Sequence, residues 1–93
     1  MAVVIVSTAL RSLTGGAERI DAQGATIRGL IEDIDRQYPG FQERVVEDDA
    51  IAPGLSVAVN GSVVGRGLWE PVPDGAEVAF VPAISGGSVP ASP

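Results

Sequence analysis

The sequence contains no cysteine, no histidine and no lysine, and its six basic residues are all arginine. Without cysteine there is no disulfide, no thiolate nucleophile and no Cys/His zinc site. Without histidine there is no imidazole general base, so a Ser-His-Asp triad is excluded. Without lysine there is no Schiff-base amine and no phosphate-binding P-loop lysine, so Gly15-Gly16 is interpreted as a turn. The chain therefore lacks the side chains on which most covalent catalysis depends.

Long apolar runs are also missing. Residues 2–10 are too short to span a membrane and lack the basic flank and cleavage pattern of a signal peptide, so we expect a cytoplasmic protein. The net charge of −6, with a pI near 4.3, disfavours nucleic acid and anionic membranes as partners and favours a protein with a basic face. Ninety-three residues with 45% hydrophobic content fit one small domain.

The first half of the sequence predicts two strands and one helix. Residues 3–7 are a β-branched run typical of a central strand, and residues 17–22 alternate as a strand with one wet face does. We expect a loop over residues 10–16 to connect them. Gly29 lies inside the predicted helix, where close contact between helix and sheet would explain it. Thr26 suits the N-cap of this helix, and Pro39-Gly40 would end it. Its apolar stripe consists of Ile27, Leu30, Ile31, Ile34 and Tyr38.

The second half predicts three more strands. Residues 41–53 show no regular pattern, and Glu47-Asp48-Asp49 within them indicates a solvated acidic loop, because calcium loops space their oxygen ligands more widely. Residues 55–59 and 62–64 are predicted to pair around Asn60-Gly61, a type I′ turn signal. Trp69 is expected to pack in the core or at its rim.

This order of elements predicts an α+β domain, in which one amphipathic helix covers one face of a mixed sheet of four or five strands. The first and last strands are the most apolar, so we expect them to be central neighbours, as in the ubiquitin-like β-grasp arrangement. In the last strand Val78 and Phe80 share one face, and we expect this bulkier pair to face the helix. The other face stays open, and its apolar side chains would form a partner surface.

The most specific motif runs from Asp74 to Gly87: an acidic-Gly turn, an apolar strand, Pro82, small apolar residues and Gly86-Gly87. In this position it resembles the ThiS/MoaD family of ubiquitin-like sulfur carriers, and the resemblance covers residues 3–87. Weaker matches, most similar to MoaD-related carriers of the cysteine-biosynthesis type, are Leu10-Arg11, Thr14-Gly15-Gly16, Tyr38-Pro39-Gly40 and Glu43-Arg44.

The resemblance implies that residues 1–87 are a carrier domain, not an enzyme, and bind no cofactor or metal themselves. An E1-like partner would use ATP to adenylate the carboxylate of Gly87, and a sulfur donor would displace AMP to leave a thiocarboxylate. A biosynthetic enzyme of the cysteine, molybdopterin or thiamine type would accept the sulfur. Gly86 and Gly87 have no Cβ and can enter a narrow slot, and residues 82–87 extended would reach roughly 20 Å into a partner.

Residues 88–93 follow Gly87, so the chain as written has no carboxylate there. Because this segment is small and proline-rich, we expect a flexible tail, removed by cleavage between Gly87 and Ser88. A peptidase related to the zinc metallopeptidases of the deubiquitinase type would suit this cut. A vestigial tail on an inactive carrier is the alternative. The residues expected to contact partner proteins are Ala79, Val81, Pro82, Ile84 and Ser85.

Two other function classes stay open at this point. A β-grasp modifier or binding module would use the same open face and the same glycines, and would pass its acyl group to a lysine of a target. A free-standing enzyme could use paired carboxylates such as Glu32 and Asp35, but these lie on the wet face of the predicted helix, and so small a domain offers no deep cleft.

Overall fold

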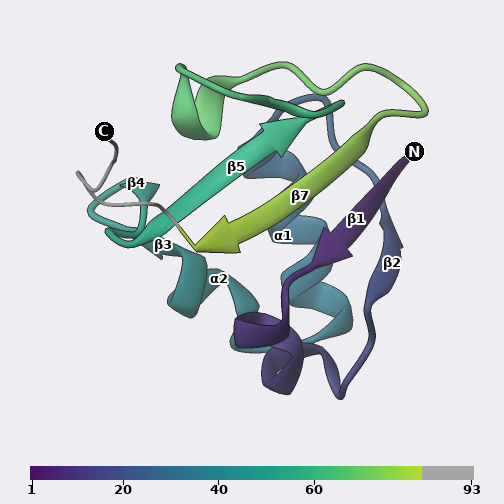
Figure 1. The fold of residues 1–93 in the computed structure, drawn as a ribbon, viewed down its shortest axis with the longest axis vertical. Helices are drawn as coiled ribbons and strands as arrows, with labels where there is room; N and C mark the ends of the chain where they lie inside the picture. Colours follow the sequence, from purple (N-terminus) through teal and green to yellow (C-terminus); the bar gives the residue numbers. More distant parts are fainter. Residues whose placement is uncertain (83–93) are drawn as a thin grey trace, which may run out of the picture.

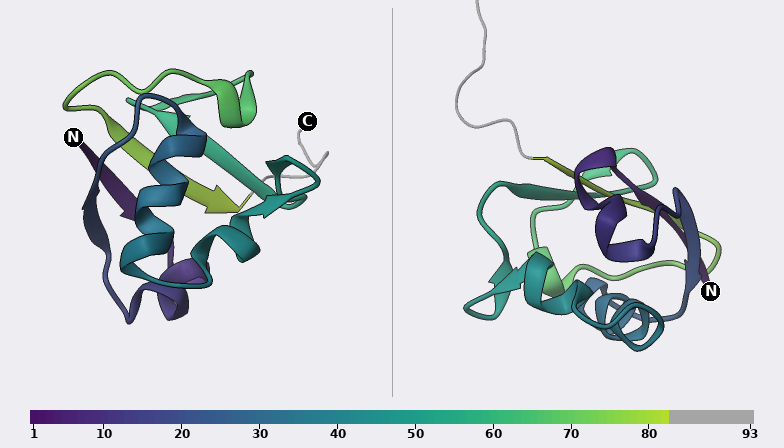
Figure 2. Two further views of the ribbon diagram at one scale, coloured as in Figure 1. Left: turned by 180° about the vertical axis from the view of Figure 1, so that it is seen from behind. Right: turned by 90° about the horizontal axis from the view of Figure 1, so that it is seen from below.

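The computed structural model describes residues 1–82 and contains a five-stranded mixed sheet with one main helix on one face (Figures 1 and 2). The strand order is β2 (Arg19–Ala22), β1 (Ala2–Val6), β7 (Glu77–Pro82), β5 (Leu55–Val59) and β6 (Ser62–Val63). This is the ubiquitin-like β-grasp arrangement, and the predicted α+β class is confirmed.

The first and last strands lie side by side in the middle of the sheet, as predicted. β1 and β7 pair in parallel, with Val4 opposite Val78 and Val6 opposite Phe80. β2 and β5 flank this pair in antiparallel orientation. Because β1 and β7 run in parallel, the ends of both strands reach the same edge of the sheet (Figure 1).

The main helix, α1 (Ile27–Gln37), begins and packs as its sequence predicts. The Oγ1 of Thr26 accepts a hydrogen bond from the backbone N–H of Gly29 at 3.2 Å, which satisfies one of the free donors of the first turn. Tyr38 is half-buried and is the C-cap, one residue before Pro39. The side chains that α1 buries against the sheet are Ile27, Leu30, Ile31 and Ile34.

Two segments are more regular than predicted. The expected loop over residues 10–16 contains a 3-10 helix, η1 (Thr8–Thr14), which ends at Gly15 with φ 64°. Residues 41–53 contain a short helix, α2 (Phe41–Val45), and a hairpin of β3 (Val46–Glu47) and β4 (Ala50–Ile51). Phe41 and Val45 are both buried and lie four residues apart, so a single helical turn carries both into the core.

Both tight hairpins have left-handed residues at their tips. Asp48 and Asp49 have φ of 54° and 58°, so the acidic segment is the tip of the β3–β4 hairpin. Asn60 and Gly61 have φ of 51° and 87°, which confirms the predicted turn between β5 and β6. In residues 1–82 no helix is long and apolar enough to cross a membrane.

The core lies between the sheet and the helices α1 and α2, on the side that faces the viewer in the left view of Figure 2. Val78 and Phe80 are fully buried there, which confirms the predicted orientation of β7. The rings of Phe41 and Phe80 meet edge to face, with centroids 5.6 Å apart. Trp69 was predicted to pack in the core or at its rim, but it is 67% exposed, so it does not lie in the core. Its neighbour Leu68 is buried instead, in the 3-10 helix η2 (Gly67–Trp69).

The close contact that we expected at Gly29 is made by a different glycine. A Cβ on Gly24, in the segment between β2 and α1, would lie 2.3 Å from the backbone nitrogen of Leu30. A Cβ on Gly29 would lie 3.5 Å from the Cα of Gly24, which is ordinary van der Waals contact. Gly24 therefore lets the chain pass against the first turn of α1, while Gly29 has room for a methyl group.

We expect Gly24→Ala to lower the free energy of unfolding by roughly 2 kcal/mol or more, because backbone must move to admit the methyl group. Gly29→Ala, the matched control, should raise it by about 0.5–1 kcal/mol, because alanine favours the helix. Urea unfolding followed by circular dichroism measures both values. Equal effects of the two substitutions would contradict this account of the packing.

Candidate functional site

The chain leaves the sheet at Pro82, the exposed last residue of β7. β7 is held on both sides, by β1 and by β5, so the exit point is fixed by two strand pairings. Pro82 pairs with Leu55 at the start of β5. The predicted site residues Ile84, Ser85, Gly86, Gly87 and Ser88 lie outside the described residues.

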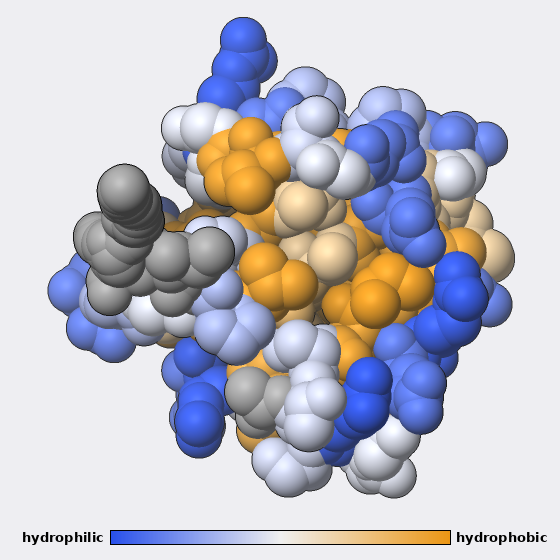
Figure 3. Space-filling model, viewed as in Figure 1, coloured by the Kyte–Doolittle hydropathy of each residue, from blue (hydrophilic) through white to orange (hydrophobic). Residues whose placement is uncertain are grey.

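The face of the sheet opposite α1 is apolar at its centre. Ala79 faces Ile5 on one side and Ala58 on the other, and Ala58 in turn faces Val63. Figure 3 shows this face, with apolar side chains gathered over the central strands and polar ones around them. We call it the open sheet face, and it consists of Val3, Ile5, Ala58, Val63, Ala79 and Val81.

The predicted partner residues are thus divided among three places. Ala79 and Val81 lie on the open sheet face, Pro82 lies at the exit, and Ile84 and Ser85 are not described. Ala58 and Val63 were not among the predicted partner residues, although alternation along residues 55–59 could have indicated Ala58. Val63 is 71% exposed and extends the face to the edge strand β6.

Charged side chains border the open sheet face along β2. Arg19 Nη2 lies 3.4 Å from Glu77 Oε2, so this ion pair bridges β2 and β7 across β1. Both side chains are well exposed, and such a pair contributes at most about 1 kcal/mol. The arrangement resembles that of protein interfaces, in which a polar rim surrounds an apolar centre.

A hollow of about 240 Å³ adjoins the exit, and we call it the exit hollow. Arg44 contributes to it from the end of α2, and Pro82 from the end of β7. Ser7, which follows β1 at the same edge, has a buried hydroxyl with no hydrogen-bond partner among the described residues. The full lining is Leu10, Arg44, Ala52, Pro53, Gly54, Leu55 and Pro82.

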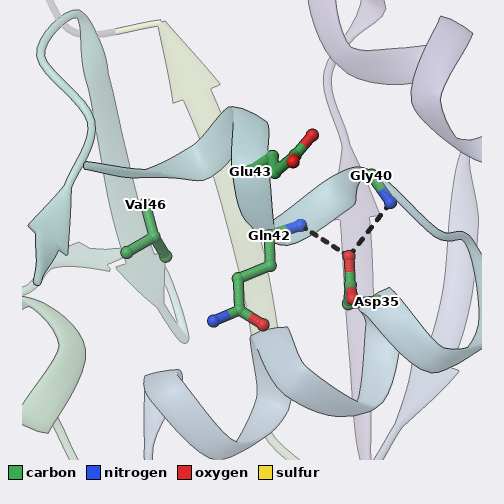
Figure 4. A pocket seen from close by; sticks show the side chains of 5 residues that line it. All are labelled: Asp35, Gly40, Gln42, Glu43 and Val46. Carbon is green, nitrogen blue, oxygen red and sulfur yellow. Dashed lines mark hydrogen bonds between the residues drawn. The ribbon is translucent and has the colours of Figure 1, made fainter.

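A larger hollow of about 410 Å³ lies beside α2, and Asp35, one of the two carboxylates that line it, has a structural role (Figure 4). The backbone N–H groups of Gly40 and Gln42 donate to Asp35 Oδ1 at 3.1 and 3.0 Å. Asp35 therefore caps the first turn of α2. Glu32, its supposed catalytic partner, lies 3.6 Å from Arg28 Nε in an ion pair on the surface of α1. These contacts do not support a carboxylate pair that works as acid and base.

Within residues 1–82, two carboxyl groups have a lowered pKa, and both lie at the opposite end of the sheet from Pro82. The backbone N–H of Gln23 donates to Asp33 at 2.9 Å and, with Arg36, lowers the pKa of Asp33. The N-terminal ammonium group donates to Asp74 at 2.6 Å and lowers the pKa of that carboxyl. Within residues 1–82, no group of three or more acidic side chains is placed to hold a metal ion.

The described residues thus define a ubiquitin-like β-grasp protein whose last strand carries the chain out from the centre of the sheet. A model of the ThiS family matches residues 4–87, and the chain belongs to this family. The resemblance predicted from the Asp74–Gly87 motif is therefore confirmed.

Individual relatives agree with this membership. The chain is 34% identical over 91 residues to the sulfur carrier protein CysO of Mycobacterium tuberculosis, which covers 90% of this chain and 96% of the relative. It is 30% identical over 71 residues to small archaeal modifier protein 3 of Haloferax volcanii, covering 74% and 76% of the two chains.

A solved structure also agrees. A chain in the crystal structure of the Amycolatopsis orientalis BexX/CysO complex is similar with a TM-score of 0.85 and 32% identity, covering 94% of this chain and all of that chain. The protein is therefore a sulfur carrier of the ThiS/CysO type, and the prediction that it is a carrier and not an enzyme is confirmed.

We expect Asp35→Ala to lower the free energy of unfolding by about 1 kcal/mol, because two backbone N–H groups lose their acceptor. Glu43→Ala is the matched control: it removes the same charge from the same hollow, and Glu43 accepts no hydrogen bond from the described residues. Its effect should stay within about 0.5 kcal/mol. Chemical unfolding measures both, and equal losses would show that Asp35 does not cap α2.

Proposed function

We propose that Gly87 carries the sulfur, as a thiocarboxylate formed after residues 88–93 are removed. The observation that carries this proposal is the family match, which ends at residue 87, the second glycine of Gly86-Gly87. Hydrolysis of the bond between Gly87 and Ser88 by a peptidase of the zinc metallopeptidase type would give Gly87 the carboxylate that activation requires.

The chemistry then proceeds in two steps on a partner protein. An E1-like enzyme joins the Gly87 carboxylate to the α-phosphate of ATP, and pyrophosphate leaves. A sulfur donor next attacks the acyl carbon, so that a C–S bond forms, the C–O bond to AMP breaks and AMP leaves with the electron pair. The thiocarboxylate is a better nucleophile than the carboxylate, and a biosynthetic enzyme of the cysteine, molybdopterin or thiamine type accepts its sulfur.

The structure suits the passive role that this chemistry gives the carrier. β7 lies between two strands, so the base of the segment that reaches the partner is rigid. The open sheet face next to it offers an apolar surface with a polar rim, on which the activating enzyme would dock. Nucleotide, metal and acid–base groups would all come from the partner.

A second candidate function is conjugation to other proteins. The observation that favours it is the 30% identity to small archaeal modifier protein 3 of Haloferax volcanii. A conjugate would use the same adenylate but transfer the Gly87 acyl group to a lysine amine of a target, with AMP as the leaving group. Because this chain contains no lysine, it could not form lysine-linked chains of itself.

We expect the chain ending at Gly87 to form an acyl-adenylate with ATP and the activating enzyme, and then to gain the mass difference between sulfur and oxygen when sulfide is added. Intact mass spectrometry measures both products. The chain ending at Gly86 is the control for placement of the acyl carbon, and the uncut 93-residue chain should not react. Sulfur transfer by the uncut chain would refute the processing step, and an isopeptide adduct without thiocarboxylate would favour the modifier.

We expect Ala79→Glu to raise the KM of the activating enzyme for the carrier at least about tenfold, because it places a charge at the centre of the docking surface. The free energy of unfolding should change by no more than about 1 kcal/mol, because the side chain points away from the core. Ser62→Glu is the control, with the same charge change at an exposed residue of β6. An unchanged KM for Ala79→Glu would rule out docking through this face.

A further inference from the structure

The arginines of the chain fall into two groups. Arg19, Arg28 and Arg36 form ion pairs with carboxylates of the described residues. None of the ion pairs among those residues involves Arg11, Arg44 or Arg66. In a chain with twelve acidic and six basic residues, carboxylates outnumber arginines, so partners for all six were available.

Two arginines of the second group lie at the edge where the chain leaves the sheet. Arg44 lines the exit hollow together with Pro82. Arg11 donates from Nε to the backbone oxygen of Val6 at 3.2 Å, and Val6 pairs with Phe80 two residues before Pro82. This bond fixes the base of the Arg11 guanidinium, and no hydrogen bond within residues 1–82 engages its two Nη groups, which can meet a planar acceptor. Arg66 lies elsewhere, directly before η2.

The position of these arginines limits what can meet them. Residues 83–87 span at most about 18 Å when fully extended. Any protein that acts on the acyl carbon of Gly87 in an enclosed active site must therefore bring the entrance of the channel to that site within this distance of Pro82. The rim of that entrance would then come close to the exit hollow, which Arg44 lines, and to the end of β1, where Arg11 donates to the backbone oxygen of Val6.

We propose that Arg11, Arg44 and the apolar lining of the exit hollow form a recognition site for an acidic segment of the activating protein, at the rim of the channel that admits the chain. A carboxylate from that segment forms a bidentate bond with an arginine fork, and a small apolar side chain beside it fills the hollow. This inference rests on the proposed function and adds that the entrance of the partner is negatively charged. That charge is opposite in sign to the basic partner face that the net charge of the whole chain favours.

A structural role for Arg44 is the competing explanation. Arg44 lies in the last turn of α2, where a cation interacts favourably with the helix dipole. That role would appear in the stability of the isolated carrier and would leave its binding to partners unchanged. Binding and unfolding measurements on the same variants therefore separate the two explanations.

We expect Arg44→Glu, in the chain ending at Gly87, to raise the KM of the activating enzyme for the carrier about tenfold, with kcat unchanged, because the site lies away from the reacting carbon. The increase should shrink at high salt. Arg66→Glu is the matched control, because it makes the same charge change at an arginine that lies away from the exit edge and forms no ion pair within residues 1–82. Its KM should equal that of the parent.

The absence of lysine permits a direct test of the partner's charge. Arg44→Lys keeps the cation and introduces the one side-chain amine of the protein, and Arg66→Lys does the same at the control position. A carbodiimide joins such an amine to a carboxylate in contact with it, without a spacer. We expect the new amine of Arg44→Lys to crosslink to an aspartate or glutamate of the activating enzyme, and peptide mass spectrometry identifies the joined residues. Arg66→Lys should give no crosslink through residue 66. Each variant treated alone provides the background.

Different outcomes refute different statements. If the parent chain ending at Gly87 forms no adenylate, the proposed function fails. If the parent is adenylated but Arg44→Glu and Arg66→Glu have the same KM, or Arg44→Lys forms no crosslink while its adenylation persists, the acidic-rim inference is wrong and the carrier function stands. A loss of stability in Arg44→Glu with normal KM would assign Arg44 to the helix dipole.

Discussion

The parallel pairing of β1 with β7 is the constraint on which the rest of the structure depends. It places the most apolar strands at the centre of the sheet, where both edges of β7 are hydrogen-bonded. It also brings η1, which follows β1, to the edge where the chain departs after Pro82. A register shift of one residue would expose Val78 and Phe80 and bury Ala79, so packing against α1 fixes the exit point as firmly as it fixes the core.

The two faces of the sheet differ because only one is covered. On the covered face the central strands carry large side chains that meet α1 and α2, such as Phe80 against Phe41. On the open face the centre is occupied by the small residues Ala58 and Ala79, and larger apolar residues lie beside them. Small residues in the centre limit the apolar area exposed to water and leave room for side chains of another protein, which a face of leucine or phenylalanine would not.

The sequence was most informative where its pattern is long or has a known turn chemistry. Five strands, the cap at Thr26 and the Asn60-Gly61 turn followed from local rules that the tertiary structure does not override. The short helix α2 could not be predicted, because one turn has no period to detect and its cap comes from Asp35 on another helix. The position of Trp69 could not be predicted for a related reason. Either Leu68 or Trp69 could face the core, and only the path of η2 decides between them. The exit hollow is likewise built from segments far apart in the sequence, so no local pattern indicates it.

The net charge of this carrier and the local charge near Pro82 act over different distances, and they need not have the same sign. At physiological ionic strength charges are screened over about 8 Å, so the net charge of −6 affects the approach of partners more than their final contacts. In contact, the groups within a few ångströms decide, and near Pro82 these include Arg11 and Arg44. An acidic protein can therefore present two cations at the edge where, under the proposed function, its chain would enter a partner. If a partner recognises that edge, recognition also favours the productive orientation, because only docking with the exit toward the partner's channel would bring these cations to its rim.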